Sequence, residues 1–382
     1  MRILVLGGYG NFGKRLVKSL IEYSANEVII AGRNILKANQ LAVLIAQEFP
    51  DRISAIKLDA LDQNLDKKIE KQKPDIVVNA SGPFHFQTSF KQKNGSQNYN
   101  VPRACLYAKC HYIDLADNRD FVCNFRESLN KRAKKLNLVF VTGASTVPSL
   151  TDAVIQHYLC QFSELNSIKF GISPGNRTER GNSTVASILS YTGKPFKTLS
   201  NGKQRTIFGW QNLSRYDFGL PIGPRWMSNC DIPDLELLPL KYPNLTSVNF
   251  QAGLEVSILH LGLWFLSLIS RIGIVKNWSR FSKTLTKMSE LFSTLGSDSG
   301  GMFIEMSGVG LNKKSKRICW QLVAEDGVGP NVPVIPAELI IKKLEQNKLK
   351  SGASPCMGLF TLDEFFNVAD RWNIFQKEVN DE

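Results

Sequence analysis

Short apolar runs alternate with segments of helical periodicity over the first 142 residues of the chain. The runs are rich in Val, Ile and Leu and have the length of strands; they cover residues 2–6, 27–31, 53–58, 75–80, 111–115 and 138–142. The segments between them predict helices at residues 11–23, 34–48, 63–72, 101–110 and 121–136. Regular alternation of this kind predicts a parallel sheet with helices on both faces. Six strands joined by five helices match a complete doubly wound Rossmann sheet, which is an α/β fold.

The pattern changes after Pro148. Residues 149–161 have helical periodicity, but from residue 166 to residue 330 isolated strands stand between connections rich in Gly, Pro and Asn. The predicted strands are residues 167–172, 246–250, 302–308 and 317–324. Strands without regular helical crossovers are typical of an α+β domain with a largely antiparallel sheet.

The length of the chain, 382 residues, exceeds the size at which a single hydrophobic core stops growing, so two domains are expected. We predict a Rossmann domain over residues 1–147 and an α+β domain over residues 148–334. Helical periodicity returns at residues 335–349 and 361–375. We expect this C-terminal segment, residues 335–382, to pack back on the first domain.

The first predicted strand ends in a glycine-rich loop that opens the first helix. Gly8, Gly10 and Gly13 satisfy the pattern G-x-G-x-x-G. In that pattern the first glycine permits a tight turn, the second lets the backbone approach a pyrophosphate, and the third lets the helix pack on the strand. The sequence therefore predicts a dinucleotide at the helix start, contacted by Gly8, Tyr9, Gly10, Asn11, Phe12 and Gly13. A glycine turn needed only for packing is the alternative.

A basic residue ends the second predicted strand. Arg33 follows Gly13 by twenty positions, where an NAD-binding domain usually has an acid for the ribose 2′-hydroxyl. An acid there would repel a 2′-phosphate, whereas an arginine can pair with it through two hydrogen bonds. The sequence therefore favours NADP over NAD, with a solvated loop cation as the alternative for Arg33. Asn34 can add a hydrogen bond to the cofactor or cap the next helix.

The third and fourth predicted strands also end in candidate cofactor contacts. Asp59 and Ala60 stand where an adenine edge is usually met, although Asp59 can equally cap the helix near residue 63. Ser81, Gly82 and Pro83 form a loop of small residues that lets the backbone pass close to the nicotinamide ribose. A simple turn is the alternative for this loop.

Motifs along nearly the whole chain match one known family. Those in the first domain are VLGGYGNFG, AGRN, LDALD, VNASGPF and HYIDLAD. The later ones are GASTVPSLTDAV, RGNSTVASILSYTGKPF, GPRW, CDIPDLELLP, AGLE, GSDSGGM and GVGPNVP. On these motifs the chain resembles the saccharopine dehydrogenase-like oxidoreductases, and more narrowly a bacterial subgroup. The chain departs from that subgroup at Val328, where the subgroup has an acidic residue.

The resemblance implies an NADP-linked redox enzyme in which a second domain covers the nicotinamide. It also implies a small-molecule substrate and a homodimer. The cofactor contacts that it implies are Gly8, Gly10, Gly13, Arg33, Asn34, Ser81, Gly82 and Pro83. It does not imply that saccharopine is the substrate.

The fifth predicted strand carries the candidates for acid–base chemistry. Ligands of doubly wound sheets bind at the carboxyl ends of the strands, and His111, Tyr112 and Asp114 lie in this strand or at its end. Asp114 is the preferred acid/base and Tyr112 the second choice, with a loop or helix-capping carboxylate as the alternative for Asp114. His85, just beyond Pro83, is a further candidate near the expected nicotinamide pocket.

Three arginines of the second domain are candidates for binding an acidic group of the substrate. Arg177 and Arg180 lie in a glycine-rich loop, and Arg225 lies between Pro224 and Trp226. A guanidinium can bind a carboxylate or phosphate through two parallel hydrogen bonds. For Arg225 a structural cation–π contact with Trp226 is the alternative.

Residues 256–270 form an apolar run without a formal charge, followed by Lys276, Arg280, Lys283 and Lys287. Three interpretations stand: a helix buried in the second domain or at a dimer interface, an amphipathic helix on an anionic membrane, and a membrane span. His260, inside this run, is interpreted as a core histidine. The apolar content also suggests a hydrophobic or lipid-like substrate with an enoyl or keto group.

Charge and composition exclude several other classes. The formal net charge is +13, but no block of basic residues and no nucleic-acid-binding motif occurs, so no nucleic-acid partner is expected. Seven scattered cysteines without paired spacing argue against a disulfide framework and a metal site. The first apolar run is too short for an export signal, so we expect a cytoplasmic protein. Peripheral membrane contact through residues 256–270 stays open as one of the three interpretations of that run. The rival to an oxidoreductase is a non-catalytic NADP-binding sensor or scaffold.

Overall fold

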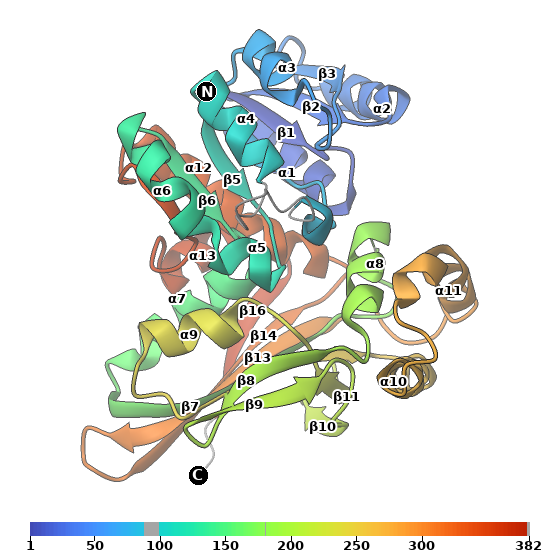
Figure 1. The fold of residues 1–382 in the computed structure, drawn as a ribbon, viewed down its shortest axis with the longest axis vertical. Helices are drawn as coiled ribbons and strands as arrows, with labels where there is room; N and C mark the ends of the chain where they lie inside the picture. The colour runs from blue at the N-terminus through green and yellow to red at the C-terminus, as the bar shows by residue number, and fades with distance from the viewer. Residues whose placement is uncertain (88–98, 180, 380–382) are drawn as a thin grey trace. The chain divides into compact units, whose positions relative to one another are not determined.

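A computed structural model describes residues 1–87, 99–179 and 181–379 (Figure 1). The chain forms two compact units. The first consists of Met1–Leu150 and Asn331–Phe360, and the second of Thr151–Pro330 and Thr361–Glu382. The C-terminal segment is therefore divided between the units, whereas the sequence analysis expected all of it on the first.

The sheet of the first unit has seven parallel strands in the order β15-β6-β5-β4-β1-β2-β3. Their bounds are β1(Arg2–Leu6), β2(Glu27–Gly32), β3(Ile53–Lys57), β4(Ile76–Asn79), β5(His111–Asp114), β6(Val139–Thr142) and β15(Gly352–Pro355). The six predicted strands are present and the Rossmann α/β prediction is confirmed. The seventh strand, β15, was not predicted because its sequence, GASP, has no apolar run.

Helices connect the strands of the first unit. They are α1(Asn11–Glu22), α2(Ile35–Ala46), α3(Leu65–Gln72), α4(Asn100–Ala108), α5(Arg119–Cys123), α6(Phe125–Lys135) and α12(Ile335–Glu345), with the short helices η1(Phe84–Gln87) and η2(Thr146–Leu150). The predicted helix 121–136 is divided at Asn124 into α5 and α6. In α1 the apolar stripe of Leu16, Val17 and Ile21 is fully buried. Burial of this face and of the aliphatic strands holds the helix on the sheet.

The register of this sheet defines the edge at which ligands bind. In neighbouring strands Leu6 pairs with Ala31 and with Asn79, and Asn79 pairs with Asp114. The carboxyl ends of β2, β1, β4 and β5 thus lie in one row. The chain order reverses between β1 and β4, which is the switch point where doubly wound folds bind their ligands.

The second unit is built on a seven-stranded sheet in the order β10-β11-β12-β7-β13-β14-β16. The bounds are β7(Phe162–Ser173), β10(Ser214–Asp217), β11(Pro224–Asn229), β12(Ser247–Leu254), β13(Gly300–Gly310), β14(Ser315–Ala324) and β16(Ile374–Val379). Only β12 and β7 pair in parallel, so the prediction of a largely antiparallel sheet is confirmed. A separate hairpin joins β8(Pro195–Ser200) to β9(Lys203–Phe208).

The helices of this unit are α7(Thr151–Leu159), α8(Asn182–Tyr191), α9(Asp234–Lys241), α10(Ser257–Arg271), α11(Ser282–Glu290) and α13(Leu362–Ala369), with η3(Trp278–Phe281) as a short helix. A further short helix, η4(Gly329–Val334), precedes α12. Among the residues that the structure describes, no helix has both the length and the apolar character to cross a membrane.

Candidate functional site

The glycine loop is held on β2 by backbone hydrogen bonds. The amides of Gly7 and Gly8 both donate to the carbonyl oxygen of Ala31, at 2.7 and 3.2 Å, and the amide of Gly10 donates to that of Gly7 at 2.8 Å. Gly7 has a φ of +82°, which favours glycine. A Cβ atom on Gly13 would lie 2.1 Å from the carbonyl oxygen of Gly7, so only glycine lets α1 start directly on the loop.

The start of α1 has the features of an anion site. Its N-cap residue is Gly10, which has no side chain to cap the helix, and its first turn holds no acidic residue. The first amides of a helix have no partner within the helix, and the helix dipole makes this end positive. A pyrophosphate of a dinucleotide fits these donors, as in other doubly wound folds.

Tyr9 connects the glycine loop to the end of β2. Its ring lies on Gly32, where an added Cβ would be 2.3 Å from the Tyr9 Cε1 atom. The Tyr9 hydroxyl accepts a hydrogen bond from the amide of Asn34 at 2.9 Å. The Asn34 side chain accepts one from the amide of Lys37 at 3.2 Å and caps α2. These contacts fix the backbone on both sides of Arg33.

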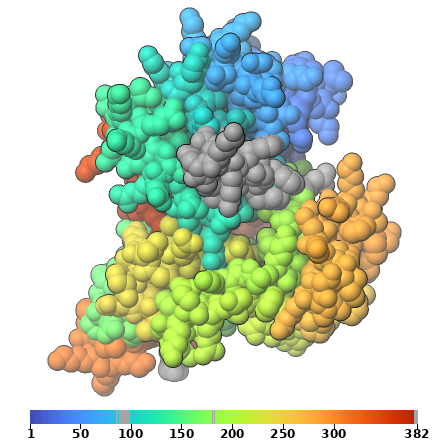
Figure 2. Space-filling view, viewed as in Figure 1, coloured from blue at the N-terminus to red at the C-terminus, as the bar shows by residue number. Residues whose placement is uncertain are grey.

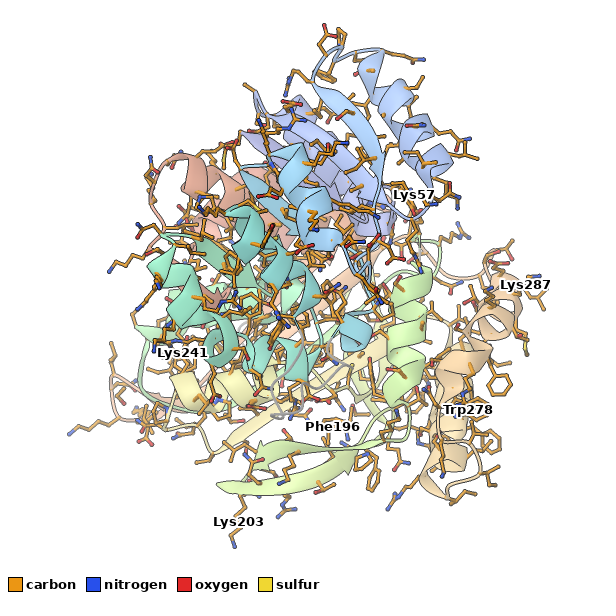
Figure 3. All side chains as sticks on the ribbon, turned by 45° about the horizontal axis from the view of Figure 1, so that its top comes forward. Lys57, Phe196, Lys203, Lys241, Trp278 and Lys287 are labelled. Carbon is orange, nitrogen blue, oxygen red and sulfur yellow. The ribbon has the colours of Figure 1, made fainter. Side chains whose placement is uncertain are left out.

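The Arg33 side chain is exposed and forms no hydrogen bond or ion pair with the residues that the structure describes. Lys57, at the end of β3, is also exposed and pairs in register with Gly32 (Figure 3). Two cations therefore lie at the carboxyl ends of neighbouring strands, Arg33 just after β2 and Lys57 as the last residue of β3. The sequence analysis missed Lys57, because only strand pairing brings it to this position.

The loop after β3 is a turn rather than a helix cap. The Asp59 carboxylate accepts a hydrogen bond from the amide of Leu61 at 3.0 Å. Helix α3 begins six residues after Asp59, at Leu65, with Asn64 at its N-cap. Of the two roles considered for Asp59, capping of this helix is thus not observed. Ala60 is buried, and its carbonyl oxygen accepts a hydrogen bond from the Asn100 side chain.

A buried polar network positions the loop after β4. The Asn79 Oδ1 atom accepts from the amide of Ser81 at 3.1 Å and from its hydroxyl at 2.5 Å. The Asn79 Nδ2 atom donates to Gln87 at 3.0 Å and to the hydroxyl of Tyr112 at 3.3 Å. Gln87 in turn donates to the carbonyl oxygen of Ser81 at 2.7 Å. Gly82 follows Ser81, so the network defines the path of the backbone past this strand end.

Asp114 ends β5 in the same row as Asn79 and is fully buried. Its Oδ1 atom accepts hydrogen bonds from the amides of Ala116 and Gly143, at 2.9 and 2.8 Å, and from the hydroxyl of Thr142 at 2.9 Å. Its Oδ2 atom makes no hydrogen bond within the part of the chain that the structure describes. One oxygen thus holds the loops after β5 and β6, and the Tyr112 hydroxyl interacts with the carboxylate and lowers its pKa.

Burial raises the pKa of Asp114 from 3.8 to about 6, against its hydrogen bonds, which lower it. The native state therefore binds this proton more tightly than the unfolded chain does. Stability falls as the pH rises from about 4 to about 6, and the ionised native carboxylate costs about 3 kcal/mol above that range. Burial also raises the pKa of Tyr112, and the charge of Asp114 adds to this effect.

The candidate arginines of the second unit differ in their surroundings: Arg225 lies in β11, and Arg177 lies in the loop after β7. Arg225 donates to Glu255 at 2.8 Å, and both side chains are buried, with exposures of 8% and 9%. The Glu255 carboxylate also accepts from the amides of Asn176 and Ser297, at 2.6 and 2.9 Å. The charge of Arg225 is thus balanced inside the protein. Arg177 is exposed and donates to the carbonyl oxygen of Thr294 at 3.0 Å.

Arg180 and the side chain of His85 lie outside the described residues. The cation over the Trp226 ring is Arg215, at 4.9 Å, and not the neighbouring Arg225, because successive side chains of a strand point to opposite faces.

His260 is a core histidine. Its Nδ1 atom accepts from the amide of Leu254 at 3.2 Å, so its Nε2 atom carries the proton and donates to the hydroxyl of Ser228 at 2.9 Å. Burial lowers the pKa of His260 to about 4, which keeps the ring neutral. Among the described residues, no group of three or more His, Cys, Asp and Glu side chains is placed to hold a metal ion.

Residues 3–141 match the family model of the saccharopine dehydrogenase NADP binding domain. The chain has a saccharopine dehydrogenase-like NADP-binding domain. Its cofactor is NADP, as predicted. No curated protein matches the chain in sequence.

Among solved structures, the chain is similar to apo saccharopine dehydrogenase (L-Glu forming) from Saccharomyces cerevisiae, with 13% sequence identity and a TM-score of 0.66. The match covers 99% of this chain and 100% of the yeast chain, so the two proteins share their fold over both units. A variant of meso-DAPDH from Clostridium tetani with DAP is matched at 12% identity and a TM-score of 0.46, over 95% of each chain.

Proposed function

We propose that this protein is an NADP-dependent oxidoreductase acting on a small-molecule metabolite. The observation that carries the proposal is the pairing of an uncapped helix start with an exposed arginine one strand away. The helix start at Gly10 offers amides to a pyrophosphate, and Arg33 offers a guanidinium to a 2′-phosphate. The NADP-binding domain and the shared fold support the same activity.

The ends of β1, β2, β3 and β4 each receive a part of the cofactor in this proposal. The pyrophosphate lies on the backbone of the loop from Gly8 to Gly13, and Tyr9 holds that loop against Asn34. Arg33 and Lys57 bind the 2′-phosphate. The adenine contacts the turn of Asp59 and Ala60, and the nicotinamide ribose contacts Ser81, Gly82 and Pro83. The bound nicotinamide supplies hydride transfer.

For the proton that accompanies the hydride we propose Asp114, with Tyr112 as the second candidate. General acid–base catalysis works best when the pKa of the group lies near the working pH. The raised pKa of Asp114, about 6, satisfies this condition, and its Oδ2 atom makes no hydrogen bond to a described residue.

Arg177 is a better candidate than Arg225 for binding an acidic group of the substrate. Its guanidinium is exposed and donates only one hydrogen bond that the structure describes, whereas Glu255 already balances the charge of Arg225. We propose a hydrophobic substrate with an enoyl or keto group, because the run of residues 256–270 is apolar and carries no formal charge. A cytoplasmic homodimer is part of the same proposal.

The second candidate function is an NADP-binding sensor or scaffold without turnover. Full burial of both Asp114 and Tyr112 favours it, because an acid/base must reach its substrate. A screen of enoyl and keto compounds for NADPH oxidation separates the two. An enzyme that uses Asp114 should lose at least about a hundredfold in turnover in Asp114→Asn, with NADPH affinity unchanged.

Cofactor binding is tested by isothermal titration of NADPH and NADH into wild type and Arg33→Ala. A hydrogen bond to a charged group contributes about 1.5–3 kcal/mol, so the Kd for NADPH should rise by about ten- to a hundredfold. The Kd for NADH should not change. Arg126→Ala is the matched control, because Arg126 is an exposed cation of α6. Equal affinity of the wild type for both cofactors would contradict the assignment of Arg33.

A further inference from the structure

Helix α10 and its C-cap residue, Ile272, expose one apolar stripe to solvent. Ile258, Leu261, Phe265 and Ile272 have exposures of 60%, 37%, 57% and 71%. Their spacing of three, four and seven residues places them on one side of the helix axis. The opposite side is buried, through His260, Leu263 and Ser267. A helix that is apolar all round is normally buried all round, so this stripe lacks the cover that its composition predicts.

The segment after α10 extends this surface. Trp278 of η3 donates its indole N–H to the carbonyl oxygen of Leu266 at 3.0 Å, which ties η3 to α10 (Figure 3). Trp278 and Leu285 of α11 both pack against the core cluster that holds Leu263. On the outside of this segment further apolar side chains are exposed: Ile274, Phe281, Met288 and Leu291. Figure 2 shows the segment, in orange, at the molecular surface.

The same segment is strongly basic. Lys276, Arg280, Lys283 and Lys287 are all exposed. Glu290 is the one acidic residue between Ser257 and Leu295. None of the four cations forms an ion pair with a residue that the structure describes. Exposed apolar side chains interleaved with free cations characterise helices that lie in the headgroup region of anionic membranes.

We propose that the surface of α10, η3 and α11 docks on an anionic phospholipid bilayer, with α10 in the plane of the interface. The apolar stripe enters the acyl boundary and the four cations bind lipid phosphates. A second copy of the chain fits this surface less well, because a two-fold contact would bring the same cations of both copies together. The proposal goes beyond cofactor binding and does not depend on it.

The test is co-sedimentation of the full-length protein with vesicles at low salt. One set of vesicles is pure phosphatidylcholine, and the other is equal parts of phosphatidylcholine and phosphatidylglycerol. Wild type should bind only the second set, and salt should weaken this binding. A basic residue near an anionic surface contributes about 1 kcal/mol, so Lys283→Glu/Lys287→Glu should lower the partition coefficient at least about thirtyfold.

Phe265→Asp tests the apolar stripe. Burial of a Phe side chain contributes about 1.5–3 kcal/mol, so partition into the anionic vesicles should fall by about ten- to a hundredfold. Leu311→Asp is the matched control for this variant, and Lys203→Glu/Lys314→Glu for the charge variant. These residues are exposed in the strand hairpins of the same unit. Both controls should bind like wild type.

Three outcomes would overturn the proposal. The first is that wild type fails to bind the anionic vesicles, and the second is that it binds both vesicle sets equally. The third is that wild type is a dimer that Phe265→Asp dissociates, without any vesicle binding. The last outcome, seen by analytical ultracentrifugation, would assign the surface to a protein contact. NADPH titration of each variant separates this test from that of the proposed function, because the cofactor should bind all of them equally.

Discussion

Gly13→Ala is the sharpest test of how the glycine loop holds the cofactor. The new methyl group would lie 2.1 Å from the carbonyl oxygen of Gly7 and 2.8 Å from the Cα atom of Gly8. Both are backbone atoms, so α1 and the loop must separate by roughly 1 Å to restore a normal contact. Charge-assisted hydrogen bonds of about 2.8 Å to a pyrophosphate would then exceed the hydrogen-bond limit.

The expected loss follows from those hydrogen bonds. Two bonds to a charged phosphate contribute at least about 3 kcal/mol, so the Kd for NADPH should rise by more than about a hundredfold. Overpacking costs about 1–3 kcal/mol of stability, and the better helix propensity of Ala returns about 1 kcal/mol. The variant should therefore remain folded, with a free energy of unfolding reduced by at most about 2 kcal/mol.

Calorimetric titration with NADPH and urea unfolding measure the two quantities. Gly262→Ala in α10 is the matched control, because a Cβ atom there meets nothing within 4 Å. That variant should gain about 0.5–1 kcal/mol of stability and bind NADPH like wild type. A folded Gly13→Ala protein with a Kd within threefold of wild type would refute the reasoning.

Two further predictions concern buried charges. Asp114→Asn removes a carboxyl with a pKa of about 6, so its stability relative to wild type should rise by about 3 kcal/mol from pH 3 to pH 7 in urea unfolding; parallel pH profiles would disprove this. Glu255→Gln leaves the buried Arg225 without its anion and should cost about 3–5 kcal/mol. Arg317→Met, in a pair where Arg317 is 50% exposed, is the control and should cost less than about 1 kcal/mol; equal costs would contradict the role of burial.

The strands of the first unit could be predicted because each carries its own signal. Parallel strands are covered on both faces, so β4 and β6 are buried at every position and appear as continuous apolar runs. In the second unit the signal is weaker. β9, KQRTIF, is exposed over its first four residues and was not predicted. The sequence indicated a helix over residues 361–375, but α13 ends at Ala369 and β16 begins at Ile374.

In the candidate site, too, some features have a local sequence signal and others do not. The glycine pattern and Arg33 are local, since the loop geometry depends on neighbouring residues. The network of Asn79, Gln87 and Tyr112 joins residues up to 33 positions apart. The pair of Arg225 and Glu255 joins residues 30 positions apart. No local pattern reveals such partners, because strand pairing brings them together.

Local backbone requirements and the period of apolar residues were sufficient to determine the Rossmann sheet, the glycine loop and the preference for NADP. Tertiary contacts alone decided which charges are balanced: Glu255 neutralises Arg225, while Arg33 stays exposed. They also decided that α10 buries the side of His260 and leaves Phe265 in solvent. The reason is that composition determines how apolar a segment is, whereas exposure depends on what the rest of the chain packs against it.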